Sequence, residues 1–584
     1  MTREAFHILN SLYSGMQGRA ACTADIDSMK AVENREVWNS LAEQGLISAN
    51  GSLTEKGLAA LEPYRVRNAV ILAAGASTRF IPLSLEQPKG LYEVKGERLI
   101  ERQIQQLTEA GIRDITLVLG YKKEMFYYLR EKYGVNIVIN ESYNVKNNIQ
   151  SILLAREVLG NSYVCVSDSY FVENPFNQFE YQTFYAGISV PGETGEMYVE
   201  TDADRRIVRM EPKQNGGQIL LGHSFWDLAF ADAFLALADA DAVVGKYNSS
   251  FWEWLVRDNL AQMPPMYFKA YKQDSIFEFD YFEELRNFDT QYLSHTHSEI
   301  IRNIKLVFRC DEEDIVNFRN VSEGLTNTSF IFNVNGVDYI YRHPGDGTEK
   351  IINRRNEKRS LIKAKEIGVD PTYIYADINE GWKISVFIPE FREPDYSSFE
   401  DSKKVLRVLR KLHSSGVTVD YGMKPWDDAL DMEALLLKKD PDCFTDHVEL
   451  KRKIQTLYER TVGDGVEKCF CHGDTYKPNW MIRPDGSVIL IDWEYSGWSD
   501  PGIDVGYYIV DAMYDFDEAE RFIREYLGEQ FTERIFFHYM AYVAIIAYYW
   551  FVWAMYRESC GAVMGEALEN WRSIAEKYAN YLCK

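Results

Sequence analysis

The residues with the clearest chemical content lie late in the chain, between residues 470 and 504. They are His472-Gly473-Asp474, then Asn479, then Asp492 at the end of a short apolar run. Transfer of a phosphoryl group from a nucleotide needs a carboxylate that accepts the proton of the attacking hydroxyl, and oxygen ligands that hold Mg²⁺ against the phosphates. An Asp, an Asn five residues later and an Asp closing a strand supply these groups. We therefore expect a phosphotransferase site here; the competing interpretation is an Asp- and Gly-rich turn before a buried strand.

The pattern H-G-D-x-x-x-x-N followed by I-D-W-E resembles that of choline kinases and aminoglycoside phosphotransferases. The resemblance implies a bilobal protein-kinase-like fold for residues 296–584. It also implies that Asp474 is the catalytic base and that Asn479 and Asp492 are Mg²⁺ ligands.

The same resemblance suggests the nucleotide-binding residues of this half. Thr326 and Asn327 lie in a G-L-T-N turn similar to the phosphate-covering loop of choline kinases. Arg342 occupies the position where kinases place a cation on the third strand, and Glu357 is expected to pair with it. The alternative for Glu357 is a plain surface helix of mixed charge.

A long apolar segment, residues 535–556, contains 22 residues without Asp, Glu, Lys or Arg. Its length would span a bilayer, but its aromatic residues are spread along it instead of gathered at the ends. A buried helix is therefore expected, with no membrane insertion. In choline kinases this region builds the aromatic choline pocket, so the resemblance assigns Tyr549, Trp550 and Trp553 to substrate, with Glu494 supplying negative charge. Trp550 and Trp553 are three residues apart and share a helical face.

A second group of candidate residues follows a predicted buried strand that ends near Ala73. A loop containing Gly75 and Ala76 comes next, and such loops let backbone N–H groups approach phosphates. Arg79 and Lys89 add positive charge. The run L-A-A-G-x-x-T-R … P-K-x-L … G-x-x-L-I resembles nucleotidyltransferases that activate sugar phosphates and phosphocholine. That resemblance assigns Ala73, Gly75 and Ala76 to the nucleotide, and Arg79 and Lys89 to charge stabilisation in catalysis. In this chain Ser77 replaces the family's second glycine.

Alternating strands and helices over residues 66–295 predict a doubly wound α/β sheet. Asn148 and Ser151 belong to an N-N-x-x-S run that resembles the phosphocholine branch, where it lies near the base and ribose. Asp168 ends a strand, where open α/β sheets bind ligands. The family uses such an Asp for Mg²⁺, together with an acid from a late E-x-D, here Asp280.

Aromatic residues are dense between these two carboxylates. A quaternary ammonium has no N–H to donate, so a protein holds it with ring faces and a nearby carboxylate. Trp226, Trp252 and Tyr198 are the candidates for this role in phosphocholine binding. Most of the aromatic residues in this part are expected to be core.

Residues 1–65 read as a small helical unit with a short hairpin, similar to winged-helix domains. This segment has 6 Lys and Arg against 8 Asp and Glu, so a docking or regulatory role is favoured over DNA binding. The net charge of -24 likewise argues against nucleic acid as a partner. The eight cysteines predict neither a zinc site nor a disulfide framework. Without a signal peptide at the start, a cytoplasmic location is expected; the oligomeric state stays open, a homo-oligomer included.

Together the two resemblances imply a multidomain α/β and α+β enzyme. One half would phosphorylate choline with ATP, and the other would join phosphocholine to CTP, giving CDP-choline and pyrophosphate with Mg²⁺ in both sites. Phosphocholine decoration of a surface polysaccharide is implied by resemblance only. Three alternatives remain: a sugar kinase fused to its nucleotidyltransferase, the ethanolamine-specific equivalent, and a choline-sensing DNA-binding regulator.

Overall fold

The computed structural model describes residues 1–16, 35–212, 214–248, 250–290, 292, 297–321, 328–344, 353–560 and 564–584. The chain divides into two compact units, one formed by residues 1–313 and 318–320 and the other by residues 314–317 and 321–584. The division thus falls later than the boundary expected at residue 295. Helix α12, Glu299–Phe308, belongs to the first unit, whereas the predicted boundary places it in the phosphotransferase half.

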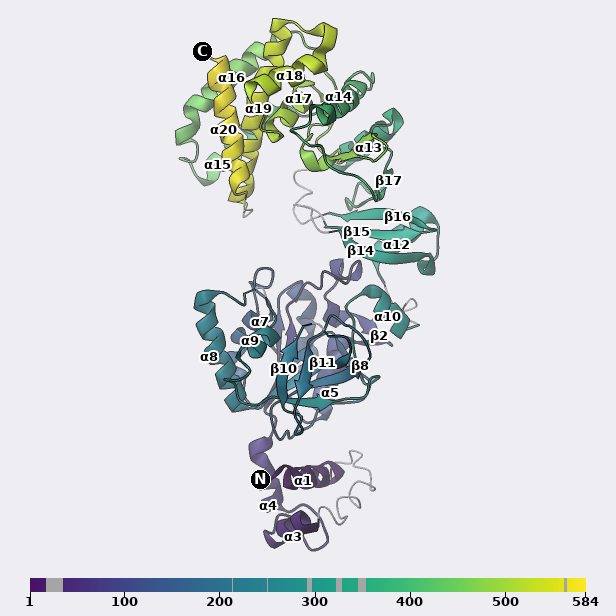
Figure 1. The fold of residues 1–584 in the computed structure, drawn as a ribbon, viewed down its shortest axis with the longest axis vertical. Helices are drawn as coiled ribbons and strands as arrows, with labels where there is room; N and C mark the ends of the chain where they lie inside the picture. The colour runs from purple at the N-terminus through teal and green to yellow at the C-terminus, as the bar shows by residue number, and fades with distance from the viewer. Residues whose placement is uncertain are drawn as a thin grey trace. The chain divides into compact units, whose positions relative to one another are not determined.

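The N-terminal segment of the first unit is a small helical layer (Figure 1). Helices α1 (Arg3–Met16), α3 (Arg35–Glu43) and α4 (Glu55–Leu61) surround a short antiparallel bridge between Ile47 and Leu53. Their apolar side chains form one cluster that includes Phe179 of the next domain. The helices and the hairpin agree with the sequence, and the winged-helix likeness stays a prediction.

A nine-stranded mixed sheet forms the core of the first unit (Figure 1). The four central strands are parallel, in the order β6-β1-β4-β5. Their bounds are β1 Asn68–Ala73, β4 Ile115–Leu119, β5 Asn136–Ile139 and β6 Ser162–Val166. This part matches the predicted doubly wound sheet. The sheet continues with antiparallel strands, namely β8 Phe184–Val190, β9 Tyr198–Thr201, β10 Ile207–Glu211 and β11 Gly217–Trp226, and with β12 Tyr267–Ala270, which runs parallel to β8.

Helices of the first unit pack on this sheet. They are α5 Leu99–Glu109, α6 Tyr128–Tyr133, α7 Asn148–Leu154, α8 Leu228–Val244 and α9 Trp252–Asn259. A further helix, α10 Phe282–Phe288, follows β13. Outside the large sheet, β7 (Ser169–Phe171) and β13 (Ile276–Glu278) form a separate antiparallel pair in which Glu278 lies opposite Ser169. That register brings Asp168, which precedes β7, close to Asp280, which follows β13.

The second unit has the two lobes expected of a kinase-like fold. One lobe is a five-stranded sheet in the order β14-β15-β16-β18-β17, with helix α13 (Arg354–Ile367). The strand bounds are β14 Ile315–Val321, β15 Thr328–Val334, β16 Val337–His343, β17 Tyr373–Ala376 and β18 Lys383–Val386.

The other lobe is helical (Figure 1), and short strands carry the predicted catalytic stretch. Its helices are α14 Phe399–His413, α15 Pro425–Lys439, α16 Val448–Val462, α17 Gly502–Asp511, α18 Phe516–Leu527, α19 Glu533–Ser559 and α20 Glu566–Leu582. Its strands are β19 Cys469–Cys471, β20 Trp480–Ile482, β21 Val488–Leu490 and β22 Gly497–Ser499.

Helix α19 is the central helix of this lobe. It is long and apolar enough to cross a membrane, but 83% of its most apolar window is buried inside the protein. Gly502 of α17 lies so close to it that a Cβ there would stand 2.5 Å from the ring of Tyr542. This packing fits the buried core helix that the aromatic spacing predicts.

Candidate active sites

A cavity of about 520 Å³ opens at the carboxyl ends of the central strands of the first unit. Most of the residues predicted for this half line it, namely Ala73, Gly75, Arg79, Lys89, Asn148, Ser151, Asp168 and Asp280. Ala76, predicted to contact nucleotide, is not among the lining residues. Ser77, which stands in place of a glycine, lines the cavity with a φ of 49°, a backbone conformation that favours glycine.

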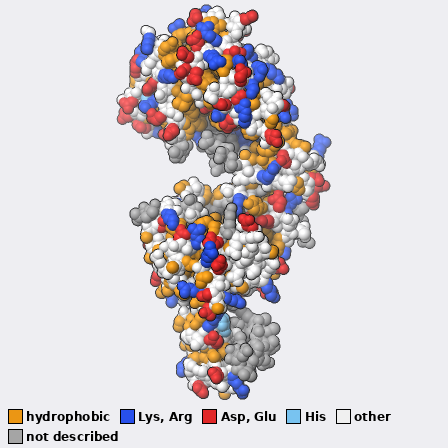
Figure 2. All heavy atoms as spheres, in the orientation of Figure 1, with side chains coloured by type: hydrophobic (Ala, Val, Ile, Leu, Met, Phe, Trp, Pro, Cys, Tyr) orange, Lys and Arg blue, Asp and Glu red, His pale blue; other side chains and the backbone are white. Residues whose placement is uncertain are grey.

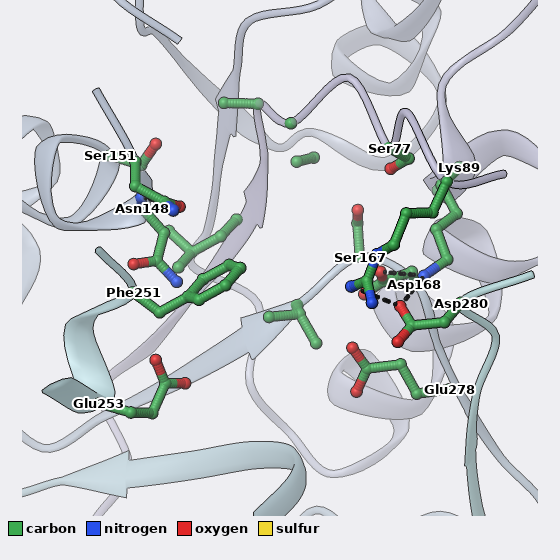
Figure 3. Close-up of a pocket in the computed structure, with 18 of the residues that line it drawn as sticks. Ser77, Lys89, Asn148, Ser151, Ser167, Asp168, Phe251, Glu253, Glu278 and Asp280 are labelled. Carbon is green, nitrogen blue, oxygen red and sulfur yellow. Dashed lines mark hydrogen bonds and ion pairs between the residues drawn. The ribbon is translucent and has the colours of Figure 1, made fainter. Parts of the chain in front are cut away.

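Lys89 joins the two predicted Mg²⁺ ligands (Figure 3). Its Nζ lies 2.7 Å from Asp168 Oδ2 and 3.8 Å from Asp280 Oδ1, and Arg79 lies 3.1 Å from the same oxygen of Asp280. Burial by itself lowers the pKa of Lys89, but Asp168 and Glu278 hold it above its ordinary value. The ammonium is therefore charged, and the two aspartates face one space.

These carboxylates fit a divalent cation, because Mg²⁺ in nucleotide sites takes one or two carboxylates together with phosphate oxygens. Asp168 and Asp280 would hold the ion, while Lys89 and Arg79 would meet the phosphates. Glu278, which the E-x-D pattern also offered, lines the same cavity and was not chosen from the sequence.

Two further acids in the cavity, Glu196 and Glu253, were missed by the sequence analysis. Glu253 Oε1 accepts a hydrogen bond of 2.8 Å from the Tyr185 hydroxyl, while its Oε2 is buried without a partner among the described residues. Burial raises the pKa of Glu253 to about 7. Burial, followed by Asp280, also raises the pKa of Glu196. An unpaired buried carboxylate oxygen is costly unless a cation meets it.

The aromatic residues proposed for phosphocholine from the sequence were the wrong ones. Trp226, Trp252 and Tyr198 are buried in the core and do not line the cavity. Trp252 begins α9 and stacks on Tyr185 at a centroid distance of 5.2 Å, and its ring faces the sheet. The aromatic residues that do line the cavity are Phe126, Tyr143, Tyr185, Phe251 and Trp254. The sequence Phe251-Trp252-Glu253-Trp254 contains both kinds of residue. Which of them point into the core and which line the cavity depends on how α9 is rotated about its axis, and the sequence does not show this.

Figure 3 shows Asn148, Ser151, Phe251 and Glu253 on one side of the cavity, and Lys89 with the acids Asp168, Asp280 and Glu278 on the other. Asn148 Oδ1 accepts a hydrogen bond of 2.8 Å from the Trp252 backbone N–H, which fixes α7 against α9. The cavity therefore offers one side with a lysine and three acids, and a second side with an amide, a hydroxyl, a ring and a carboxylate.

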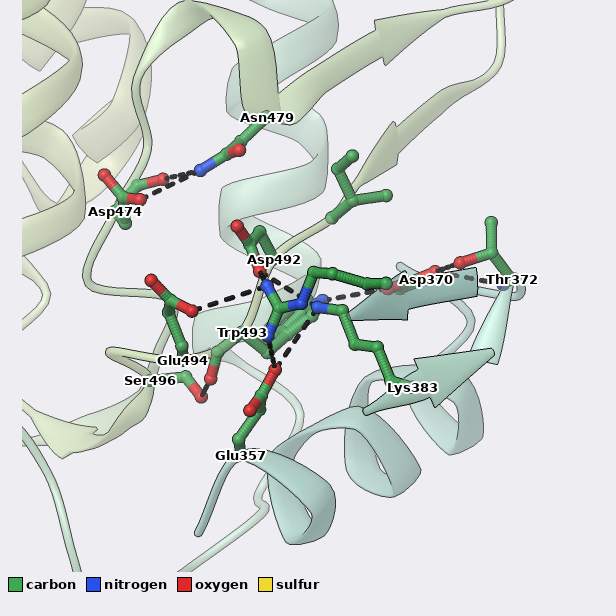
Figure 4. Close-up of polar contacts among 12 residues, drawn as sticks. Glu357, Asp370, Thr372, Lys383, Asp474, Asn479, Asp492, Trp493, Glu494 and Ser496 are labelled. Carbon is green, nitrogen blue, oxygen red and sulfur yellow. Dashed lines mark hydrogen bonds and ion pairs between the residues drawn. The ribbon is translucent and has the colours of Figure 1, made fainter. Parts of the chain in front are cut away.

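In the second unit, Asp474 and Asn479 are in direct contact (Figure 4). Asn479 Nδ2 donates to Asp474 Oδ2 at 3.1 Å and to the Asp474 carbonyl at 2.9 Å. Burial, and then the neighbouring Asp492 and Glu494, raise the pKa of Asp474 well above its ordinary value. A general base works best when its pKa lies near the operating pH, so this environment suits proton acceptance.

Two cations face Asp492 from adjacent strands. Arg342 on β16 lies 2.7 Å from Asp492, 2.5 Å from Glu357 and 3.4 Å from Glu494. Lys383 on β18 lies 3.0 Å from Asp492 and 3.2 Å from Glu357. The predicted pairing of Arg342 with Glu357 is present, whereas Lys383 was missed because no motif marks it.

Asp492 is held in place by its charges and by its backbone. Burial alone would raise its pKa, but Lys383 and Arg342 lower it below the ordinary value. Its φ is 69°, a left-handed conformation that costs free energy in a residue other than glycine. An ionised carboxylate next to the Asp474–Asn479 pair fits a Mg²⁺ ligand, as Asn479 does with its amide oxygen. Thr326 and Asn327 lie outside the described residues.

Asp504 supports the loop from behind. It accepts hydrogen bonds from the backbone N–H groups of His472 at 2.8 Å and Gly473 at 2.7 Å, and it contacts His413 Nε2 at 2.9 Å. It is fully buried. Asp504 therefore orients the backbone of this loop.

The predicted choline-pocket residues belong to one aromatic cluster. Trp550 stacks on Tyr507 at 4.8 Å, and lies 5.2 Å from Trp553 and 5.7 Å from Tyr495 by ring centroids. Burial and then the charge of Asp474 raise the pKa of the Tyr507 hydroxyl. Tyr495 packs against Gly473, the residue before Asp474, so the cluster extends from this loop into α19. Tyr495 and Tyr507 were not singled out from the sequence, although they flank its motif.

Comparisons with known proteins divide the chain in the same way. Residues 69–193 match the MobA-like NTP transferase domain, and residues 318–538 match the Phosphotransferase enzyme family.

The chain is 35% identical to a choline-phosphate cytidylyltransferase of Streptococcus pneumoniae, over 38% of this chain and 96% of the relative. It is 33% identical to a 2-aminoethylphosphonate cytidylyltransferase of Lancefieldella rimae, over 39% of this chain and 93% of the relative. The solved choline kinase LicA of Streptococcus pneumoniae is 25% identical, over 49% of this chain and 100% of that one, with a TM-score of 0.43. The identity to the first two relatives shows that this chain belongs to the cytidylyltransferase family. The match of residues 318–538 shows that it also carries a phosphotransferase domain.

Proposed function

We propose that this chain makes CDP-choline by two consecutive reactions on two sites. The second unit phosphorylates choline with ATP, and the first unit joins the resulting phosphocholine to CTP with release of pyrophosphate. Mg²⁺ is required in both sites. The observation that carries the proposal is that one chain combines two complete sets of acids and cations for phosphate chemistry with rings beside each set.

In the first reaction, the choline hydroxyl oxygen attacks the γ-phosphorus of ATP, the bond to the β-phosphate oxygen breaks and ADP leaves. Asp474 takes the hydroxyl proton, and Asn479 holds its carboxylate in place. Asn479 and Asp492 would hold the Mg²⁺ that neutralises the phosphates. The rings of Tyr507 and Trp550 would meet the methylated ammonium.

In the second reaction, a phosphate oxygen of phosphocholine attacks the α-phosphorus of CTP, and pyrophosphate leaves. Lys89 and Arg79 stabilise the negative charge that develops on the transferred phosphate. Asp168 and Asp280 would hold Mg²⁺ for the triphosphate. Glu253, with its unpaired oxygen, and the ring of Phe251 would meet the ammonium.

A second candidate function is the same pair of reactions on a primary amine, such as ethanolamine phosphate or an aminophosphonate. The specific observation in its favour is that three glutamates line the cavity, since carboxylates accept the N–H bonds that a quaternary ammonium lacks. The 2-aminoethylphosphonate cytidylyltransferase matches the chain almost as well as the choline-phosphate enzyme.

Product masses separate these functions. The full chain is incubated with ATP, CTP, Mg²⁺ and either choline, ethanolamine or a hexose, and in parallel with CTP and phosphocholine, phosphoethanolamine or 2-aminoethylphosphonate. Conversion of choline to CDP-choline is expected. Asp474→Ala should stop phosphorylation and leave CMP transfer to supplied phosphocholine intact, whereas Lys89→Ala should do the reverse. If either change stopped both reactions in folded protein, the two-site proposal would fail.

The proposal extends to the setting of the enzyme. Both sites act on small molecules, so the chain would work in the cytoplasm and supply CDP-choline for phosphocholine decoration of a surface polysaccharide. The acidic N-terminal module would then be a docking or regulatory element instead of a DNA-binding one.

A further inference from the structure

Behind the phosphotransferase loop, two cysteines and a histidine bring three metal-ligand atoms together, and phosphoryl transfer uses none of them. Cys469 and Cys471 lie on β19, two residues apart and therefore on one face of the strand. His413 ends α14. One ligand atom from each of the three lies within 4.8 Å of the others. All three side chains are buried.

The spacing of these atoms fits a tetrahedral zinc ion. The two sulfurs are 3.6 Å apart, and two thiolates bound to tetrahedral Zn²⁺ at about 2.3 Å stand about 3.8 Å apart. Two thiolates and an imidazole are a ligand set that zinc accepts. If Cys469 and Cys471 were only packing residues, a histidine would not be needed next to their sulfurs.

The histidine also has the second partner that zinc-binding histidines require. Its Nε2 lies 2.9 Å from Asp504 Oδ2, and its Nδ1 lies 2.7 Å from the Tyr526 hydroxyl. Because Asp504 accepts hydrogen bonds from two backbone N–H groups, His413 Nε2 carries the proton. The Nδ1 lone pair then accepts the hydrogen bond of the Tyr526 hydroxyl, and a metal ion at Nδ1 would replace that proton. A carboxylate that holds the far nitrogen of a histidine orients the near one for a metal.

We propose that Cys469, Cys471 and His413 bind one structural Zn²⁺, with the Tyr526 hydroxyl or a water in the fourth position. On binding, the two thiols release their protons to solvent as the two Zn–S bonds form. The ion would fix His413, and through it Asp504. Asp504 in turn holds the backbone N–H groups of His472 and Gly473 next to the catalytic Asp474. The zinc would thus stabilise the loop without touching substrate.

The first test is the metal content of the full chain, produced in zinc-supplemented medium and freed of loose metal by gel filtration. One zinc per chain is expected, and replacement by Co²⁺ should give a thiolate-to-cobalt charge-transfer band. Protein without zinc and without that band would overturn the proposal. So would a chain two hydrogens lighter, because a Cys469–Cys471 disulfide excludes thiolate ligands.

Variants locate the ion. Cys471→Ala and the milder Cys469→Ser should each lose the zinc, whereas Cys165→Ala, which removes a buried cysteine from β6 of the first unit, should keep it. Transfer of CMP to phosphocholine reports whether each variant is folded in its first unit, and circular dichroism reports on the helical lobe. Zinc retained in the double variant Cys469→Ser/Cys471→Ala would place the ion elsewhere and refute the assignment.

A functional readout separates a structural ion from a bystander. A zinc-selective chelator, added with Mg²⁺ in excess, should lower the unfolding temperature of the second unit and slow choline phosphorylation. CMP transfer, which uses the first unit, should not change. If the chelator removed the zinc but changed neither the unfolding temperature of the second unit nor the rate of choline phosphorylation, the proposed link from His413 through Asp504 to the loop would be wrong.

Discussion

Arg342 and Lys383 lie directly opposite each other on adjacent antiparallel strands, and both contact the same two carboxylates, Glu357 and Asp492. The phosphotransferase site is therefore built around a pair of cations instead of the single strand cation of the sequence prediction. One cation cannot neutralise two buried carboxylates. Both Arg342 and Lys383 are therefore needed to keep Glu357 and Asp492 ionised.

Lys383→Ala should lower kcat/KM for choline phosphorylation by about 100-fold, the effect of about 3 kcal/mol lost from buried charge pairs. The loss should appear largely in the KM for ATP, since Asp492 and Glu357 would then compete for Arg342. Steady-state kinetics with varied ATP measure it. Lys403→Ala is the matched control, because Lys403 forms an ion pair with the exposed Glu400 on the surface of α14. Equal effects of the two variants would contradict the role of Lys383.

Asp474→Asn should abolish phosphorylation but stabilise the second unit at neutral pH. Folding raises the pKa of Asp474 above its ordinary value of 3.8, so the native state binds more protons than the unfolded chain. Stability is therefore lost as pH rises from about 4 through the native pKa, by about 1.4 kcal/mol for each pKa unit. The variant removes this cost. Thermal unfolding at pH 4 and pH 7.5 should show a gain only at the higher pH.

The control for that measurement is Asp446→Asn, which changes an exposed aspartate of the same lobe. It should leave the unfolding temperature unchanged at both pH values. A destabilised Asp474→Asn at pH 7.5 would show that the carboxylate is compensated in the native state.

The KM for phosphocholine should fall as pH rises through about 7. Burial raises the pKa of Glu253 to about 7, so this carboxylate is neutral below that pH and negative above it, where it attracts the ammonium. Glu253→Gln should have a higher KM that no longer changes with pH in this window. Glu200→Gln, at an exposed position on β9, should keep the wild-type profile. An unchanged pH profile in Glu253→Gln would assign the titration to another group.

Phe251→Ala should raise the KM for phosphocholine about tenfold, the equivalent of about 1.4 kcal/mol for a lost cation–π contact. Trp226→Phe should leave that KM unchanged and instead lower the unfolding temperature of the first unit, because Trp226 is core. Kinetics and thermal unfolding of both variants are measured. The opposite pattern would restore the sequence prediction over the cavity lining.

The sequence predicted the fold, and the residues that it predicts for phosphate chemistry come together in the structure, since both depend on local patterns. The Asp474–Asn479 spacing, the glycine loop after β1 and the acid after β6 each sit within one strand–loop segment. What it missed depends on pairing between distant segments. Lys383 reaches the site only through its register with Arg342, and Glu253 reaches the cavity only through the phase of α9.

The aromatic residues failed for the same reason. Ring composition does not say which side of a helix faces a cavity, and Trp252 and Glu253 are neighbours in sequence with opposite surroundings. Likewise, Cys469 and Cys471 gain their partner His413 only when α14 packs beside β19. Long-range packing, which no local motif records, decides all three cases.

The close approach of α17 to α19 has a consequence for how this lobe can evolve. A methyl group at Gly502 would stand 2.5 Å from the Tyr542 ring, and one at Gly506 would stand 3.0 Å from the Tyr542 backbone. Helix α17 also carries Asp504, which holds the catalytic loop. A side chain added at Gly502 would push α17 away from α19 and move Asp504 away from the catalytic loop. Substitutions at this position would therefore be selected against for lost catalytic activity as well as for lost stability.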